Sequence, residues 1–127
     1  MKKRVLAVAF AFLMFCLLSS CDPAYWYEYS ITNTTDTVIT VSYKVFRFDS
    51  VLNVNRNETV VVFYGNHGVE GGKGGPYYED VNKQFQYFIV SKQGDTSNRD
   101  YLKNETWGYG VVNGEGHYSA TVDSSEF

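Results

Sequence analysis

Residues 24–45 read AYWYEYSITNTTDTVITVSYKV, and this stretch decides the fold. Apolar and polar residues alternate with a period of two in both halves, at 25–31 and at 39–45, which is the pattern of half-buried β-strands. Between them, residues 33–36 (NTTD) form a turn sequence, because these side chains hydrogen-bond to nearby backbone. We expect the two segments to pair with each other as a β-hairpin.

Alternating segments continue to the end of the chain. Further strands are predicted at 49–54, 59–64, 85–90, 106–112 and 117–122. The segments 59–64 (TVVVFY) and 85–90 (FQYFIV) are apolar on both faces, which predicts that each lies in the middle of a sheet with cover on both sides. Asn113-Gly114 predicts a type I′ hairpin turn before the last strand.

The connections between these strands carry further signals. A proline and two acids predict a short helical turn near Tyr78–Lys83. Ser97 and Asp100 resemble a capping box, which predicts a second helical turn near Asn98–Leu102. The segment Gly65–Gly75 has six glycines in eleven residues and is expected to form a long crossover loop.

Seven strands of this kind in about 100 residues predict an all-β domain. We expect an antiparallel immunoglobulin-like β-sandwich of about seven strands over residues 25–127, with a small barrel as the alternative. The immunoglobulin cysteine pair is absent from the sequence. The architecture of that fold is therefore expected, and membership of the immunoglobulin family is not.

The amino terminus has the organisation of a secretory signal. A basic start, Lys2-Lys3-Arg4, precedes 14 uncharged residues at 5–18, whereas a helix needs about 20 apolar residues to cross a bilayer. We therefore expect residues 1–20 to be a cleaved signal peptide. Their removal changes the net charge from −3 to −6, and so acidic a domain is not expected to bind nucleic acid.

The signal ends in Leu18-Ser19-Ser20-Cys21, which resembles the lipobox of bacterial lipoproteins. The resemblance implies that Leu18, Ser19 and Ser20 are recognised for cleavage and that Cys21 becomes the lipid-modified first residue. Residues 21–24 would then form a lipidated amino terminus and a short tether. Two or more acyl chains, at about 0.8 kcal/mol per buried CH₂, make a stable membrane anchor.

The cysteine count agrees with lipid attachment. Cys16 lies within the signal, so Cys21 is the one cysteine left after cleavage and has no disulfide partner. We expect a lipid-anchored protein of the bacterial cell envelope. A single acid, Asp22, follows the cysteine, whereas surface-exported lipoproteins carry a short acidic run there. The expected location is therefore the outer membrane facing the periplasm, with the cell surface as the alternative.

The sequence carries no recognisable motif for catalysis or metal binding. Gly72-Lys73 lacks the earlier glycine and the following Ser or Thr of a P-loop. His67 and His117 stand fifty residues apart without metal-ligand spacing, and both are expected on the surface. No Gly-x-Ser-x-Gly nucleophile elbow is present. We therefore expect a protein that is not an enzyme, with no catalytic residues, no metal and no cofactor.

Aromatic residues are the remaining candidates for binding. Most lie on the apolar side of the alternation and are expected in a tyrosine-rich core. Trp26 lies on the polar face of its strand, and Tyr64, Tyr77 and Tyr78 flank the glycine-rich segment. Exposed aromatics beside a loop are typical of a binding patch. These four residues are candidate ligand or partner contacts, and local packing under the loop is the alternative.

Taken whole, the chain is similar to small lipoproteins of Bacteroidetes to which no activity is assigned. The shared features are the lipobox, the strand and turn at 29–36, the turn at 55–59, the PYYED sequence at 76–80 and the ending at 107–127. The resemblance implies an envelope β-sandwich and no particular activity. It also implies O-glycosylation at Asp-Ser/Thr-aliphatic tripeptides, with Thr37 and Ser50 as acceptors.

Two functions follow from the sequence. The first is a non-enzymatic structural or protein-interaction module, anchored through Cys21, with another envelope protein as its partner. The alternative is a lipoprotein that binds a glycan or a small ligand through the exposed aromatics beside Gly65–Gly75.

The lipid anchor is directly testable. We expect Cys21→Ala to remain unprocessed or to be released in soluble form, because the thiol that receives the lipid is gone. Metabolic labelling with a clickable fatty acid measures this. Unchanged labelling of the variant would refute lipidation at Cys21.

Overall fold

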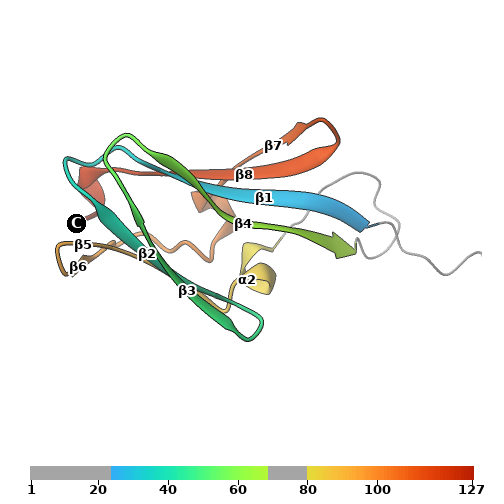
Figure 1. Ribbon diagram of the computed structural model, residues 1–127, viewed down its shortest axis with the longest axis horizontal. Coiled ribbons are helices and arrows are strands. Elements are labelled where there is room, and N and C mark those ends of the chain that lie inside the picture. The colour runs from blue at the N-terminus through green and yellow to red at the C-terminus, as the bar shows by residue number, and fades with distance from the viewer. Residues whose placement is uncertain (1–23, 69–79) are drawn as a thin grey trace, which may run out of the picture.

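The computed structural model describes residues 24–68 and 80–127, which form eight strands in two four-stranded sheets (Figure 1). In spatial order, sheet A contains β4 (Thr59–Gly68), β1 (Ala24–Asn33), β8 (Glu115–Val122) and β7 (Gly108–Val112). Sheet B contains β3 (Phe48–Val54), β2 (Ile39–Val45), β5 (Tyr87–Lys92) and β6 (Asp95–Thr96). Buried residues of both sheets form one core. The all-β prediction is confirmed, and the arrangement is consistent with a β-sandwich.

Two features of the sheets differ from the prediction. The eighth strand, β6, has two residues, which is too few to show an alternating period. In sheet A, β1 and β8 run parallel, from Tyr27 opposite Gly116 to Asn33 opposite Val122, so the wholly antiparallel prediction is wrong for this pair. The alternation along a strand is the same whichever way its neighbour runs, and sequence pattern therefore could not reveal the direction.

The expected hairpin between the first two strands is also wrong, because β1 and β2 belong to different sheets. The fully buried side chain of Asn33 fixes this crossover. Its Nδ2 donates to the carbonyl oxygens of Thr37 at 2.8 Å and Val54 at 2.9 Å, and its Oδ1 accepts from the backbone N–H of Thr35 at 2.9 Å. The predicted turn therefore connects the two sheets, and Asn33 holds it against Val54 at the end of β3.

The segment 59–64 lies at the edge of sheet A and not in its middle. Tyr29 pairs with Phe63 and Ser30 pairs with Val61, so Val62 is an extra residue, a β-bulge. The bulge directs both Val62 and Phe63 towards the core. This explains why the segment is apolar at successive positions without being covered on both faces.

The segment 85–90 lies in the interior of its sheet, as predicted, but it is not covered on both faces. Its strand, β5, lies between β2 and β6, but the outward-facing Ile89 remains exposed. Phe85 precedes the strand and is buried in the core. The outer face of sheet B is therefore uncovered at Ile89, and only the inner face is packed against the core.

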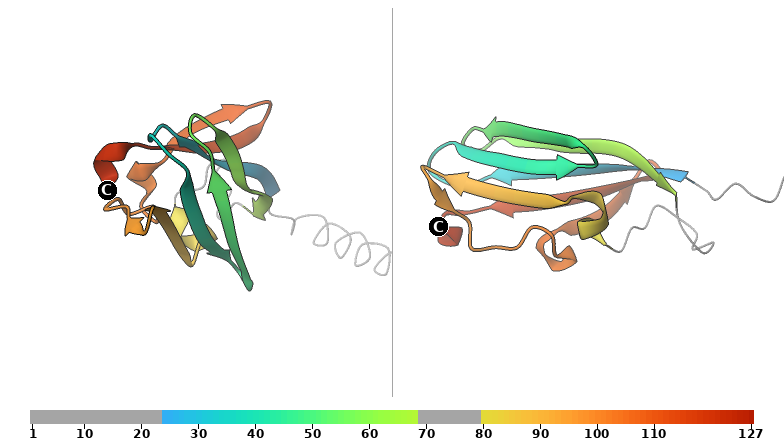
Figure 2. Two further views of the ribbon diagram at one scale, coloured as in Figure 1. Left: turned by 60° about the vertical axis from the view of Figure 1, so that its left-hand side comes forward. Right: turned by 90° about the horizontal axis from the view of Figure 1, so that it is seen from below.

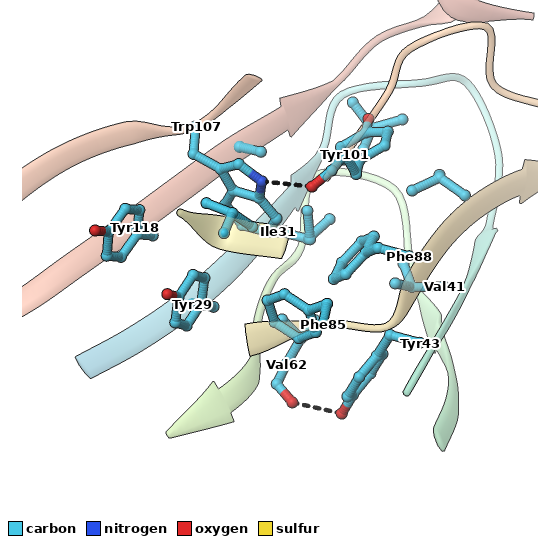
Figure 3. Close-up of a cluster of buried hydrophobic side chains, with 14 of the residues drawn as sticks. Tyr29, Ile31, Val41, Tyr43, Val62, Phe85, Phe88, Tyr101, Trp107 and Tyr118 are labelled. Carbon is cyan, nitrogen blue, oxygen red and sulfur yellow. Dashed lines mark hydrogen bonds between the residues drawn. The ribbon is translucent and has the colours of Figure 1, made fainter. Parts of the chain in front are cut away.

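The core is built mainly from aromatic rings contributed by both sheets (Figure 3). Tyr29 stacks on Tyr118 with ring centroids 4.6 Å apart, and it meets Phe85 and Trp107 edge to face at 5.1 and 5.6 Å. The Tyr43 hydroxyl donates to the Val62 carbonyl, which links β2 to β4 across the core. Such offset and edge contacts add to the stabilisation that burial provides.

Helical structure is brief within the described residues: α2 (Val81–Gln84) and the 3₁₀ turns η2 (Asn104–Thr106) and η3 (Ser124–Glu126). The first predicted helical turn overlaps α2. The second, at Asn98–Leu102, is wrong. Ser97 Oγ does accept from the backbone N–H of Arg99 at 3.1 Å, as a cap would, and its hydroxyl donates to Glu126 at 2.7 Å. The local contact forms, but no helix follows it.

The carboxylate of Glu126 joins the end of the chain to the segment after β6. It is buried, accepts from the Tyr101 hydroxyl at 2.7 Å and lies 3.2 Å from Arg99 Nη1. Burial and this hydrogen bond raise the pKa of the Tyr101 phenol above its ordinary value. Glu126 follows β8 of sheet A, and Arg99 and Tyr101 follow β6 of sheet B, so these contacts link the two sheets.

We expect Asn33→Ala to destabilise the domain by roughly 2–4 kcal/mol, because two carbonyls and one N–H lose their buried partner. Asn53→Ala is the matched control, since Asn53 is exposed and accepts one hydrogen bond, from Thr40. Its expected loss is below about 1 kcal/mol. Urea denaturation of both variants measures the free energies of unfolding. Equal losses would contradict the role assigned to Asn33.

Candidate functional site

The candidate site lies on the outer face of sheet A, where three strands contribute large polar and aromatic side chains. Tyr27 and Tyr29 of β1 are buried, so the alternation turns Trp26 and Glu28 outward. On β4, a regular alternation from the inward Val62 would direct Tyr64 into the core. The bulge shifts the phase by one residue and places Tyr64 on the outer face instead.

Trp26 and Tyr64 form a stacked pair on this face. Their ring centroids are 5.1 Å apart, the planes differ by 14°, and the side chains are 47% and 49% exposed. The Tyr64 hydroxyl donates to Glu115 Oε1 at 2.7 Å. Because β1 lies between β4 and β8, this hydrogen bond links β4 to β8 across the outer face of β1.

The second polar contact of the face joins Glu28 to His117. The two residues are register partners on β1 and β8, and Glu28 Oε1 lies 3.5 Å from His117 Nδ1. The contact is an ion pair when the imidazole is protonated. We call Trp26, Glu28, Tyr64, Glu115 and His117 together the aromatic–acidic surface.

Electrostatics within this surface act on the tyrosine. The pKa of the Tyr64 phenol is raised above its ordinary value, first because its hydroxyl donates to Glu115, and further through slight desolvation and repulsion by the Glu115 and Glu28 carboxylates. Tyr64 therefore remains a neutral hydrogen-bond donor at physiological pH. The hydrogen bond fixes the ring in its stacked position.

The surface is open on the side of β7. Gly110 pairs with His117, and a Cβ built at Gly110 would meet nothing within 4 Å. A planar aromatic pair beside two carboxylates and an imidazole can stack on a flat ligand surface and exchange hydrogen bonds with its edge. Across residues 24–68 and 80–127, no three His, Cys, Asp or Glu side chains gather as metal ligands would.

The structure brings two of the predicted contact residues, Trp26 and Tyr64, into direct contact. Tyr77 and Tyr78 lie outside the described residues, as do Cys21 and the lipobox residues Leu18, Ser19 and Ser20. Sequence reasoning missed Glu28, Glu115 and His117 as members of the site. The alternation did place Glu28 outward beside Trp26, but the pairing of β1 with β8 gave no sequence signal.

The glycine-rich segment begins later than predicted. Residues 65–68 continue β4 and pair with the first residues of β1, and residues 69–75 lie outside the described part. His67, expected on the surface, faces inward and packs against Tyr27 with ring centroids 5.1 Å apart. Burial lowers the pKa of the His67 imidazole below its ordinary value. Its role in this position is packing.

The two expected glycosylation acceptors are only partly exposed. Thr37 lies in the crossover after β1, where its carbonyl accepts from Asn33 and from the Thr35 hydroxyl. Ser50 lies within β3, opposite Tyr43. Modification at these two positions stays a prediction.

No protein-family model, curated protein or solved structure matches the chain. Within the described ranges, none of the helices has the length and apolar character required to span a bilayer.

We expect Glu115→Gln to lower the pKa of Tyr64 towards its ordinary value, because glutamine accepts a hydrogen bond without carrying a negative charge. Tyr87 is a matched control on the other sheet, since its pKa is raised in the same manner by Asp49. Titration followed by NMR of ¹³C-labelled tyrosines measures both groups. A Tyr64 pKa that does not move, or one that moves equally with Tyr87, would contradict the geometry.

Proposed function

We propose that this protein is a lipid-anchored component of a bacterial cell envelope, held through acylated Cys21, and that its immunoglobulin-like sandwich is a non-enzymatic interaction module. The lipobox resemblance and the 14-residue uncharged run support the anchor. The proposed location is the outer membrane facing the periplasm, with the cell surface as the alternative. The partner is another envelope protein, bound by the aromatic–acidic surface.

The observation that carries the interaction role is the stacked and half-exposed pair of Trp26 and Tyr64. Tryptophan and tyrosine are the residues most enriched among those that dominate the energy of protein interfaces. Here the Glu115 hydrogen bond holds Tyr64 in place before any partner arrives. A pre-positioned ring loses less conformational entropy on binding, which favours affinity.

The acidic residues of the surface support binding more than catalysis. Glu115 contacts the Tyr64 hydroxyl and Glu28 contacts His117, so each carboxylate orients a neighbour in the surface. Their negative charge favours a partner with complementary basic groups around an apolar centre. This arrangement resembles the polar rim and apolar centre of protein interfaces.

A glycan is the second candidate ligand, and the orientation of the rings favours it. The near-parallel planes of Trp26 and Tyr64, 14° apart, provide a flat platform for the apolar face of a sugar. Glu28 and His117 lie beside this platform and can bind sugar hydroxyls. Trp26 fluorescence reports this alternative when the purified protein is titrated with soluble envelope polysaccharide.

Site-specific photo-crosslinking in intact cells tests the proposal. Asn66 on β4 is the register partner of Trp26, and Asn53 on β3 is the control; both are exposed asparagines on edge strands of opposite sheets. With a benzophenone amino acid at each position, we expect a protein adduct from position 66 that Trp26→Ala reduces by about tenfold. Equal adducts from both positions, or none from position 66, would contradict the proposed surface.

A further inference from the structure

The turn between β2 and β3 carries the two most exposed large hydrophobic residues of the described chain. Phe46 and Phe48 are 72% and 76% exposed, the largest values among the exposed large hydrophobic residues. Arg47 stands between them and is also exposed. Neighbouring apolar groups of this size on a protruding turn mark a contact with another apolar phase or a partner.

The turn is held in one conformation. Phe46 has φ of 52°, in the left-handed region that a bulky side chain rarely adopts. Its carbonyl accepts from Gln86 Nε2 at 2.7 Å, and Val45 pairs with Phe48 at the base of the turn. A positive φ at this position fits a two-residue hairpin turn, and outliers of this kind at bulky residues cluster at functional sites.

The charges around the turn favour an anionic contact. Lys44 lies 3.7 Å from Asp49, so these two charges offset each other, and the Tyr87 hydroxyl also donates to Asp49. Arg47 forms no ion pair with any residue in the two described ranges. The turn therefore presents an exposed arginine that is flanked in sequence by two exposed phenylalanines, a combination suited to a lipid phosphate beside acyl chains.

The topology directs this turn back towards the end of the sandwich where β1 begins. The chain runs along β1 to the crossover at Asn33 and returns along β2, so residues 46 and 47 lie back towards the end that carries Ala24. Figure 1 and the left view of Figure 2 show the hairpin projecting from the body of the domain. Three Cα–Cα steps separate Cys21 from Ala24, a reach of at most about 11 Å.

We propose that Phe46, Arg47 and Phe48 form a second membrane contact, in which the phenyl rings enter the interfacial layer of the bilayer that holds the lipid and Arg47 binds a lipid phosphate. This inference rests on the proposed acylation of Cys21. A covalent anchor holds the turn close to the bilayer, and a second contact then fixes the orientation of the domain.

The orientation has a consequence for the aromatic–acidic surface. The β2–β3 hairpin belongs to sheet B, so a bilayer at its tip lies on the side of sheet B. The outer face of sheet A, with Trp26 and Tyr64, is then turned away from the lipid. The second contact leaves the proposed binding surface accessible to a partner.

Depth measurement on the full acylated protein tests the contact. Phe48→Cys and Gln93→Cys each receive an NBD fluorophore, and the proteins are reconstituted in phosphatidylethanolamine–phosphatidylglycerol vesicles that carry a doxyl quencher near the headgroups. Gln93 is the control because it is exposed in the turn between β5 and β6, at the opposite end of the strands. We expect at least about threefold stronger quenching at position 48 than at position 93.

Three results would overturn the inference in distinguishable ways. Equal quenching at both positions, in protein that floats with the vesicles, would remove the second contact and leave the lipid anchor intact. Failure of the acylated chain to float would remove the anchor and the contact together. An unquenched label at position 48 that is shielded in native envelopes would assign the turn to a protein partner.

Discussion

The buried side-chain amide of Asn33 is the interaction on which the arrangement of the two sheets depends. By binding the end of β3 and the following turn, it sends the chain from sheet A into sheet B after the first strand. This crossover leaves both edges of β1 free to pair with β4 and β8. A hairpin with β2 would have occupied one of those edges, and the aromatic–acidic surface would not exist.

The β-bulge at Val62 is the second local feature that the surface requires. The bulge leaves Val62 without a register partner on β1, but it directs Phe63 into the core and Tyr64 onto the outer face. Trp26 needs no such device, because regular alternation already directs it outward. One irregular residue thus joins a core contact to the stacked pair that supports the proposed interaction.

Sequence pattern predicted much of the secondary structure and part of the site. The alternation located most strands, Asn113 and Gly114 take the positive φ of the predicted turn, and Trp26 was expected outward. Period-two alternation does not encode which strands pair or in which direction, so the parallel β1–β8 contact and the inclusion of Glu115 could not be foreseen. The helical turn predicted after Ser97 shows the same limit, since Ser97 makes the local contact with Arg99 N–H but its hydroxyl also binds the distant Glu126, and no helix forms.

In sheet A, β1 lies between β4 and β8 and does not pair with β2, and the other features of the fold depend on this order. Backbone NOEs in isotopically labelled protein measure strand neighbours directly. We expect cross-strand NOEs that join Ile31 to Val60 on one side and to Ala120, in parallel register, on the other. Cross-strand NOEs that pair β1 with β2 as an antiparallel hairpin would contradict the account.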